Sequence, residues 1–312
     1  MSESLKHFNE IEWAFLPYVF HKKEVARIFL ITLLIRWHLI IEDFPWIWKT
    51  TLAKAFSKLI WYDFARIQWT SDSLPQDLIW WEVYDFATKT FVIRKWPIFK
   101  EIVLIDEINR MHPKTQSAFL QCMEEKNVTL AGVEYSLPDN HMIIATQNPI
   151  EYSGTFPLPE AQKDRFACVV SVGYPDDAIQ KDIILNSKYE NISETVSNIK
   201  SMTDHNMVKD AQDWLSKIHI KDALVDKLLS FVSWSRNEEL FHFWISPRGL
   251  NIFIQAMKAN AYLEGRDFVI PEDGRHLVTP FLFHRILVRD DYSSKQKICE
   301  LLENKYWEFL WS

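Results

Sequence analysis

The sequence predicts an α/β fold in which a parallel sheet is flanked by helices, followed by a C-terminal domain made of helices alone. Over the first half of the chain, short apolar runs alternate with amphipathic helical stretches, the pattern of parallel strands joined by helices. From Asp177 onward, strand signals become few and amphipathic helical stretches follow one another. We therefore expect residues 1–176 to form an α/β core and residues 177–312 to form a helical lid domain.

The elements of the core can be assigned in order. Residues 1 to about 36 have a helical pattern, and an apolar strand is expected at 38–41, followed by a loop and a helix over 50–60. A second strand is expected at 64–68. Alternating segments between about 69 and 100 indicate an inserted hairpin.

The remaining core elements continue this alternation. The continuous apolar run at 101–107 is typical of a central parallel strand that is buried on both faces. A helix over 113–126, a hairpin with its turn at 131–132 and a strand at 141–146 are expected next. The ligand crevice of such a sheet lies at the carboxyl ends of its strands.

Composition narrows the classes of function. The chain has 312 residues, 48% of them hydrophobic and 25% charged, as in ordinary globular proteins. A formal net charge of -7 disfavours nucleic acid as the main partner. Three widely spaced cysteines form no CxxC pair, which favours a reducing cytoplasm over a zinc site or a disulfide framework. The most apolar run, residues 28–35, is too short for a membrane span, which takes roughly 20 residues.

Three polar groups each follow the predicted end of a core strand. Lys49 and Thr50 open a helix after the first strand, where a lysine can reach nucleotide phosphates and a threonine hydroxyl can bind Mg²⁺. Asp106 could hold magnesium and Glu107 could polarise an attacking water. Asn148 could orient that water. Each signal is weak alone, but their shared position makes coincidence the poorer explanation.

Glycine and tryptophan usage is anomalous. Average usage of about 7% predicts roughly 22 glycines in a chain of this length, whereas the chain has 6, the first at Gly132, and 14 tryptophans. Trp46 and Trp48 stand in the predicted phosphate loop, whose curl uses backbone angles that glycine adopts most easily. Trp61 stands between a predicted helix and strand, where a tight turn favours a left-handed residue.

We therefore hypothesise that the source organism reads UGA as glycine and that these codons have been translated as tryptophan. Codons other than UGA at Trp46 and Trp48 would contradict this hypothesis. An ordinary core or surface role stays open for tryptophans in helical surroundings, namely Trp13, Trp214, Trp234, Trp307 and Trp311.

Five segments of the chain are informative together: "EDFPWIWKTTLAKA", "FARIQWTSDSLPQDLI", "IVLIDEINRMHPKTQSAFLQCMEE", "IATQNPIEYSGTFPLPEAQKDRF" and "ISPRGLNIFIQAMKANAYLEGRDFVIPED". With these segments the chain resembles the MoxR family of AAA+ ATPases, over about residues 20–290. The resemblance implies an AAA+ P-loop core with a helical lid, and ATP and Mg²⁺ as cofactors. This sequence departs from the family pattern in having tryptophan where such chains tend to have glycine, at Trp37, Trp46, Trp48, Trp69, Trp80, Trp96 and Trp244.

The resemblance also implies roles for individual residues. Thr50 and Asp106 would bind the metal, Glu107 and Asn148 would act on the attacking water, and Arg165 would be an arginine finger offered to a neighbouring subunit. Arg248 would be the sensor 2 arginine of the lid. The expected nucleotide-binding segment consists of Asp43, Phe44, Pro45, Trp46, Ile47, Trp48, Lys49, Thr50 and Thr51.

A finger supplied from outside requires an assembly, and the family leads us to expect a hexameric ring that remodels a client protein. A partner with a von Willebrand factor A domain is a further implication of the resemblance. Two other functions stay open. If Trp46 and Trp48 are genuine, the chain could be a degenerate P-loop scaffold that binds partners without hydrolysis. A DNA- or RNA-dependent motor is the third, and the acidic balance disfavours it.

Overall fold

The computed structural model describes residues 2–43, 49–68, 80–85, 90–95, 97–130, 133–148, 155–186, 192–289 and 294–311. A five-stranded parallel sheet lies at the centre, with strand order β2-β5-β8-β1-β9. The strands are β1 (Leu39–Glu42), β2 (Phe64–Gln68), β5 (Ile102–Asp106), β8 (Met142–Gln147) and β9 (Cys168–Val170). The predicted fold class, an α/β core with a helical C-terminal region, is confirmed.

Both faces of the sheet are buried. Successive side chains of each strand point to opposite faces, and each face packs into its own core cluster beneath helices. Ile41, Leu104 and Ile144 belong to one large core cluster, which also holds the N-terminal and C-terminal helices. Ile40, Val103 and other alternate residues belong to a second cluster beneath α5. The helices around the sheet are α1 (Ser2–Phe15), η1 (Leu16–Val19), α2 (Lys23–Leu34), α3 (Lys49–Leu59), η3 (Ile108–Arg110), α5 (Pro113–Glu125) and α6 (Glu160–Lys163).

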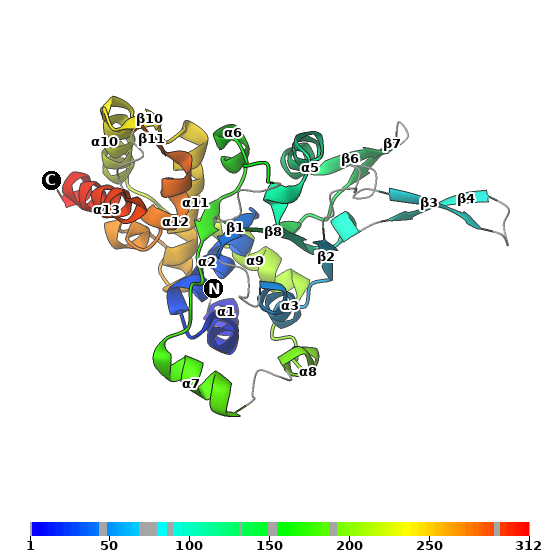
Figure 1. Ribbon diagram of the computed structural model, residues 1–312. Coiled ribbons are helices and arrows are strands. Elements are labelled where there is room, and N and C mark those ends of the chain that lie inside the picture. Colours follow the sequence, from blue (N-terminus) through cyan, green and yellow to red (C-terminus); the bar gives the residue numbers. More distant parts are fainter. Residues whose placement is uncertain are drawn as a thin grey trace.

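The predicted helices and strands of the core are observed with shifts of one or two residues at their ends. The first strand begins at Leu39 rather than His38, and the buried His38 ring accepts a hydrogen bond at Nδ1 from the backbone N–H of Ile143 at 3.0 Å. Two hairpins extend away from the body (Figure 1): β3–β4 (Trp80–Asp85 and Thr90–Lys95) and β6–β7 (Asn127–Leu130 and Val133–Ser136). A short 3-10 helix, η2 (Pro97–Phe99), follows the first hairpin.

In its described residues, the C-terminal part is helical apart from one short antiparallel pair, β10 (Phe241–Phe243) and β11 (Leu287–Val288). Figure 1 shows α10, α12 and α13 stacked beside α11 on the side of the sheet away from the hairpins. The division at residue 176 stays a prediction. The helices of this part are α7 (Asp177–Asn186), α8 (Ile192–Ser197), α9 (His205–Leu215), α10 (Asp222–Asn237), α11 (Pro247–Leu263), η4 (Pro271–Gly274), α12 (Val278–Leu282), η5 (Phe283–Arg285) and α13 (Lys295–Trp311).

The described tryptophans lie in contrasting environments. Trp214, Trp234 and Trp307 lie on helices and pack, partly buried, against the core. Trp61 instead follows α3 with φ 57° and a 61% exposed side chain, so the predicted left-handed backbone at this turn is confirmed. Trp46, Trp48, Trp69 and Trp96 lie outside the described residues.

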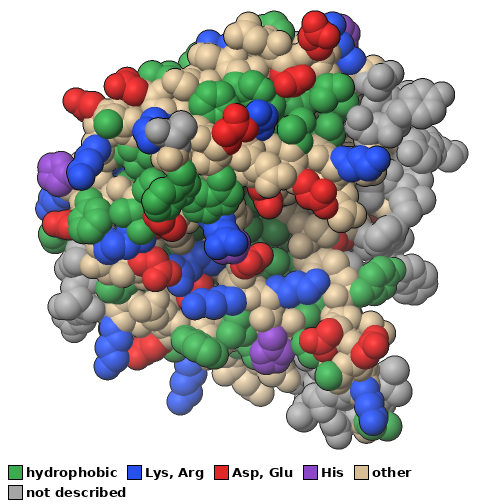
Figure 2. All heavy atoms as spheres, turned by 90° about the vertical axis from the view of Figure 1, so that its left-hand side faces the viewer, with side chains coloured by type: hydrophobic (Ala, Val, Ile, Leu, Met, Phe, Trp, Pro, Cys, Tyr) green, Lys and Arg blue, Asp and Glu red, His purple; other side chains and the backbone are tan. Residues whose placement is uncertain are grey.

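The surface made by the C-terminal helices carries charges of both signs, interspersed with apolar side chains (Figure 2). This mixture agrees with the modest negative net charge of the sequence. In the described part of the chain, no helix is long and apolar enough to cross a membrane.

Candidate active site

The predicted polar groups of three strands meet at one edge of the sheet. Strand β8 lies between β5 and β1, and all three run parallel, so their carboxyl ends are neighbours. Asp106 ends β5, Asn148 follows β8, and Lys49 begins α3 after β1. The structure therefore brings Lys49, Asp106 and Asn148 to the same edge, which we call the carboxyl edge.

Lys49 reaches back across the start of α3. Its Nζ donates a hydrogen bond to the backbone carbonyl of Asp43 at 2.8 Å, which places the ammonium group just beyond the end of β1. Thr50 and Thr51 share the first turn of α3, where backbone N–H groups without helical partners favour an anion. The predicted loop residues Phe44, Pro45, Trp46, Ile47 and Trp48 lie outside the described residues.

Asp43 has a different role from the rest of the predicted nucleotide-binding segment. Its buried carboxylate accepts hydrogen bonds from Ser171 Oγ at 2.6 Å and from the backbone N–H groups of Val172 and Gly173 at 2.7 and 3.0 Å. These bonds tie the end of β1 to the chain that follows β9. The side chain is thus used internally, and the backbone carbonyl of Asp43 accepts the hydrogen bond from Lys49.

Asp106 is paired with an arginine side chain. Its carboxylate pairs with the Arg66 guanidinium of the neighbouring strand β2, with 2.5 Å between Oδ2 and Nε. The Asp106 side chain keeps 15% of its surface exposed. A carboxylate and the Thr50 hydroxyl are hard oxygen donors of the kind that Mg²⁺ prefers, so the residues present fit the implied metal.

Glu107 lies in a strained backbone conformation. Its φ of 55° is in the left-handed region, which costs a non-glycine residue of the order of 1 kcal/mol or more. The backbone N–H of Glu107 donates to Thr146 Oγ1 at 2.9 Å, so the adjacent strand β8 holds this turn in place. The carboxylate pairs with Arg110 Nε at 3.0 Å and remains 39% exposed. Asn148 follows the neighbouring strand β8 and, unlike Glu107, is buried.

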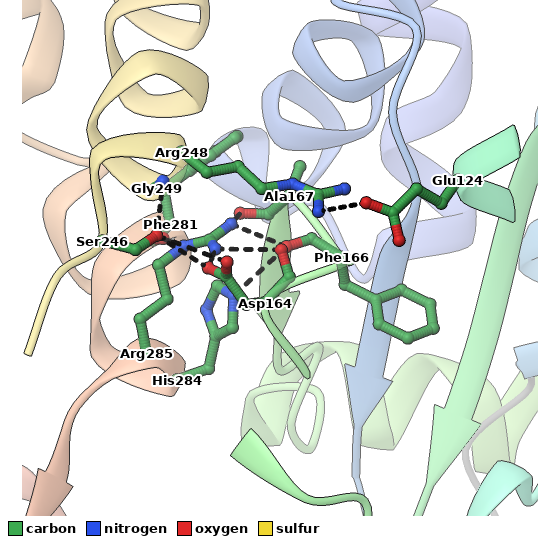
Figure 3. Close-up of polar contacts among 10 residues, drawn as sticks. All are labelled: Glu124, Asp164, Phe166, Ala167, Ser246, Arg248, Gly249, Phe281, His284 and Arg285. Carbon is green, nitrogen blue, oxygen red and sulfur yellow. Dashed lines mark hydrogen bonds and ion pairs between the residues drawn. The ribbon is translucent and has the colours of Figure 1, made fainter. Parts of the chain in front are cut away.

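The two predicted arginines lie at the opposite edge of the sheet. Arg165 precedes β9, and Arg248 lies in the first turn of α11. Both pair with one carboxylate, that of Glu124 at the end of α5: Arg165 Nε lies 3.1 Å from Oε2 and Arg248 Nη1 lies 2.9 Å from Oε1. Figure 3 shows Arg248 extended from the lid toward Glu124. We call this edge, at the amino ends of the parallel strands, the amino edge.

The length of the strands separates the two edges. Strand β5 has five residues, and a rise of about 3.3 Å per residue puts roughly 15 Å between its ends. Helix α5 carries the chain back from the carboxyl edge to Glu124 at the amino edge. The structure therefore does not bring Arg165 or Arg248 to the Lys49 of their own chain.

A cavity of about 380 Å³ opens at the amino edge. Four of the side chains that line it are cations, Arg36, Lys126, Arg165 and Arg248, and Glu124 is the acid among them. The Arg248 guanidinium also lies 5.2 Å above the centre of the Trp37 ring. This concentration of positive charge suits an anionic group of high charge density, such as a phosphate.

Sequence reasoning missed several residues of these edges. Arg66 and Glu124 are ordinary charged residues on a predicted strand and a predicted helix, and nothing in their local sequence identifies their partners. A weak signal existed for Arg66, because it lies two residues before the end of a predicted strand of the core. Glu124 could be found only from the packing of α5.

Comparison with known proteins agrees with the fold. Residues 38–168 match the ATPase family associated with various cellular activities (AAA), and residues 234–300 match the AAA lid domain. A solved structure of a candidate ATPase from Cytophaga hutchinsonii superposes with a TM-score of 0.86 and 30% identity, over 97% of this chain and 96% of that one. The fold and the site define an AAA ATPase with a lid.

The relatives narrow the family further. The chain is 32% identical to chaperone MoxR1 of Mycobacterium tuberculosis over 285 residues, which is 88% of this chain and 74% of that protein. It is 35% identical over 291 residues to the Bacillus subtilis protein YeaC, whose function is uncharacterised, covering 93% and 88% of the two chains. The chain belongs to the MoxR family of AAA+ ATPases.

Proposed function

We propose that this chain is a Mg²⁺-dependent ATP hydrolase that works as a ring, in which each active site is completed by the neighbouring chain. The observation that carries the proposal is the separation of the two edges. Lys49, Asp106, Glu107 and Asn148 face one side, while Arg165 and Arg248 face the other. A site with both sets of groups therefore needs two copies of the chain.

The chemistry assigned to the carboxyl edge is hydrolysis of the terminal phosphate bond. Lys49 would bind the β and γ phosphates, and Asn148 would orient a water molecule. Glu107 would take a proton from that water as its oxygen forms a bond to the γ phosphorus. The bond from phosphorus to the bridging oxygen breaks, and ADP and inorganic phosphate leave. Mg²⁺ held by Thr50 and Asp106 would offset phosphate charge.

The amino edge would supply the external cations. Arg165 and Arg248 would exchange the Glu124 carboxylate for the γ-phosphate bound by the neighbouring chain. An arginine supplied in this way contributes on the order of 10³ to 10⁵ in rate in well-studied nucleotide hydrolases. We further propose a hexamer, a cytoplasmic location, and a client protein that the ring remodels, with a von Willebrand factor A domain protein as a candidate partner.

The first test is ATP turnover by protein expressed with Trp46→Gly and Trp48→Gly, which we call the glycine form. Turnover that Glu107→Gln abolishes, with nucleotide still bound, is the expected result. A glycine form that binds ATP without turnover would favour the non-hydrolysing scaffold, the function that genuine tryptophans at positions 46 and 48 would also favour. Stimulation by added DNA or RNA would favour the nucleic-acid motor instead.

The second test is subunit mixing in the glycine form. Lys49→Ala chains cannot use nucleotide but keep their arginines, whereas Arg165→Ala chains keep their nucleotide site but lack the finger. Each variant alone should be inactive, and a mixture should regain turnover, because Lys49→Ala chains supply arginines to their neighbours. A mixture as inactive as its components would rule out the shared site.

A further inference from the structure

Arg285 of η5 is a buried cation whose hydrogen bonds are almost all directed at one short segment. Its side chain is 1% exposed. Its guanidinium donates to the backbone carbonyls of Asp164, Phe166 and Ala167 at 3.1, 2.7 and 3.3 Å, and it pairs with the Asp164 carboxylate. Its Nε donates to Phe281 within the lid at 3.0 Å. Figure 3 shows these bonds converging on residues 164–167.

The residue between these acceptors is Arg165. Arg285 holds the carbonyls on both sides of it, so the backbone that carries the proposed finger is fixed to the lid rather than to the sheet alone. His284 adds a contact from its Nε2 to the Phe166 carbonyl at 3.3 Å. Burial lowers the pKa of Arg285 to about 9, which leaves it a cation at neutral pH.

Asp164 also contacts the segment that carries Arg248. Ser246 caps helix α11 by accepting the backbone N–H of Gly249 at 2.9 Å, and its hydroxyl lies 3.3 Å from Asp164 Oδ2. A Cβ on Gly249 would lie 2.8 Å from Arg285 Cδ, so the guanidinium stem packs directly against this turn. Arg248 lies between the cap and that glycine.

We propose that Asp164, Ser246 and Arg285 form a clamp that sets the distance between Arg165 and Arg248, with Arg285 as its positioning residue. The inference rests on the proposed function of the two arginines. The clamp connects Asp164, at the end of α6, with Ser246, at the start of α11, which are 82 residues apart in sequence, and lets both guanidiniums reach Glu124 together.

Lysine should not replace Arg285. A guanidinium has five N–H donors in a fixed plane, and here they bind five acceptors. An ammonium has three donors and would leave carbonyls of the 164–167 segment without partners. The charge would survive in Arg285→Lys, but the placement of Arg165 would not.

The test uses Arg285→Lys in the glycine form, with Asp164→Asn as a second variant in case the first folds poorly. Both should lower kcat on the order of 10- to 100-fold, the effect of a displaced catalytic group, while affinity for a fluorescent ATP analogue stays unchanged. Turnover should return on mixing with Lys49→Ala chains and should not return on mixing with Arg165→Ala chains.

The matched control is Arg266→Met. Arg266 pairs with buried Asp273 inside the lid at 2.5 Å, and its hydrogen bonds go to Phe268 and Asp273, away from the 164–167 segment. This variant should keep kcat even though it loses a lid ion pair. A normal kcat in Arg285→Lys, a loss of nucleotide affinity, or no rescue by Lys49→Ala would each overturn the clamp.

Hydrogen exchange separates failure of the clamp from failure of the proposed function. Arg285→Lys should speed amide exchange at residues 165–168 and leave strand β5 unchanged, whether or not the ring hydrolyses ATP. Unchanged exchange at 165–168 overturns the clamp alone. Failure of the Lys49→Ala and Arg165→Ala mixture, with exchange altered as expected, overturns the shared site and leaves the clamp as a lid contact.

Discussion

Backbone conformation at single residues bears on the tryptophan anomaly. Six non-glycine residues have positive φ, among them Trp61 and Glu107, in the part of the chain that the structure describes. Glu107 is fixed by its bond to Thr146 and has a proposed role in the chemistry. Trp61 has neither justification, because its ring is mostly exposed and its turn requires only a residue that tolerates the left-handed region.

Replacing Trp61 with glycine should therefore stabilise the protein. Trp61→Gly removes a left-handed penalty of roughly 1 kcal/mol, offset in part by loss of the ring contact with His205 at 6.5 Å. Thermal melts should give a higher midpoint. The control is Trp13→Gly, which removes a 68% exposed ring from helix α1 and should lower the midpoint because glycine disfavours helix. A decrease for both variants would contradict the glycine interpretation at position 61.

At the scale of elements, sequence periodicity was informative because each strand and helix reflects local pattern. The run at 101–107 is apolar because β5 is covered on both faces, and the helix over 113–126 follows from its own spacing. Placement of Lys49, Asp106 and Asn148 at one edge followed from the rule for parallel strands. The sequence alone could not reveal that Arg248 lies beside Arg165, since both reach Glu124 only because the fold brings the start of α11 near the end of α5.

Long-range polar contacts were equally out of reach. Glu124 meets Arg248 across 124 positions, and Arg285 meets Asp164 across 121. No periodicity encodes such pairs, because surface charges are numerous and their partners are chosen by packing of whole elements. The same holds for Asp43, whose carboxylate is consumed by the chain after β9.

Contact between η4 and α13 provides a prediction at this scale. Tyr306 is fully buried and donates its hydroxyl to the Pro271 carbonyl at 2.6 Å. A Cβ at Gly274 would lie 2.1 Å from the Tyr306 oxygen. Gly274→Ala should therefore displace the ring and lower the free energy of unfolding by roughly 1–3 kcal/mol.

A double-mutant cycle checks this mechanism. Tyr306→Phe alone should cost about 1 kcal/mol, the usual worth of a hydrogen bond. Combined with Gly274→Ala, it should cost less than the sum of the two single changes, because the nearest clashing atom is gone. Strict additivity in chemical denaturation would show that the two residues do not interact.

For the molecule as a whole, three buried histidines predict the response to acid. Burial lowers the pKa of His38 to about 3 and those of His141 and His284 to about 4. In the unfolded chain these rings titrate near 6.5. Between about pH 6.5 and 4 the unfolded chain therefore binds protons that the folded chain does not, and the free energy of unfolding falls as pH falls.

Each such histidine contributes a slope of up to about 1.4 kcal/mol per pH unit in this window. Denaturant titrations between pH 6.5 and 5 should measure it. His141→Asn, which retains a donor for the Lys100 carbonyl now 2.8 Å from Nδ1, should make the slope shallower. Stability that is flat or rises on acidification would contradict neutral burial of these rings.

Glu124 has a consequence for how copies of the chain recognise each other. In a solitary subunit this acid pairs with both arginines and offsets part of the positive charge of the amino edge, so the two arginines offer less to an empty neighbour. A neighbour charged with triphosphate presents a stronger anion and can displace Glu124, whereas one holding only diphosphate presents less. In the proposed ring, the strength of each subunit contact would then depend on the nucleotide bound there. An interface that holds ADP would dissociate more readily than one that holds ATP.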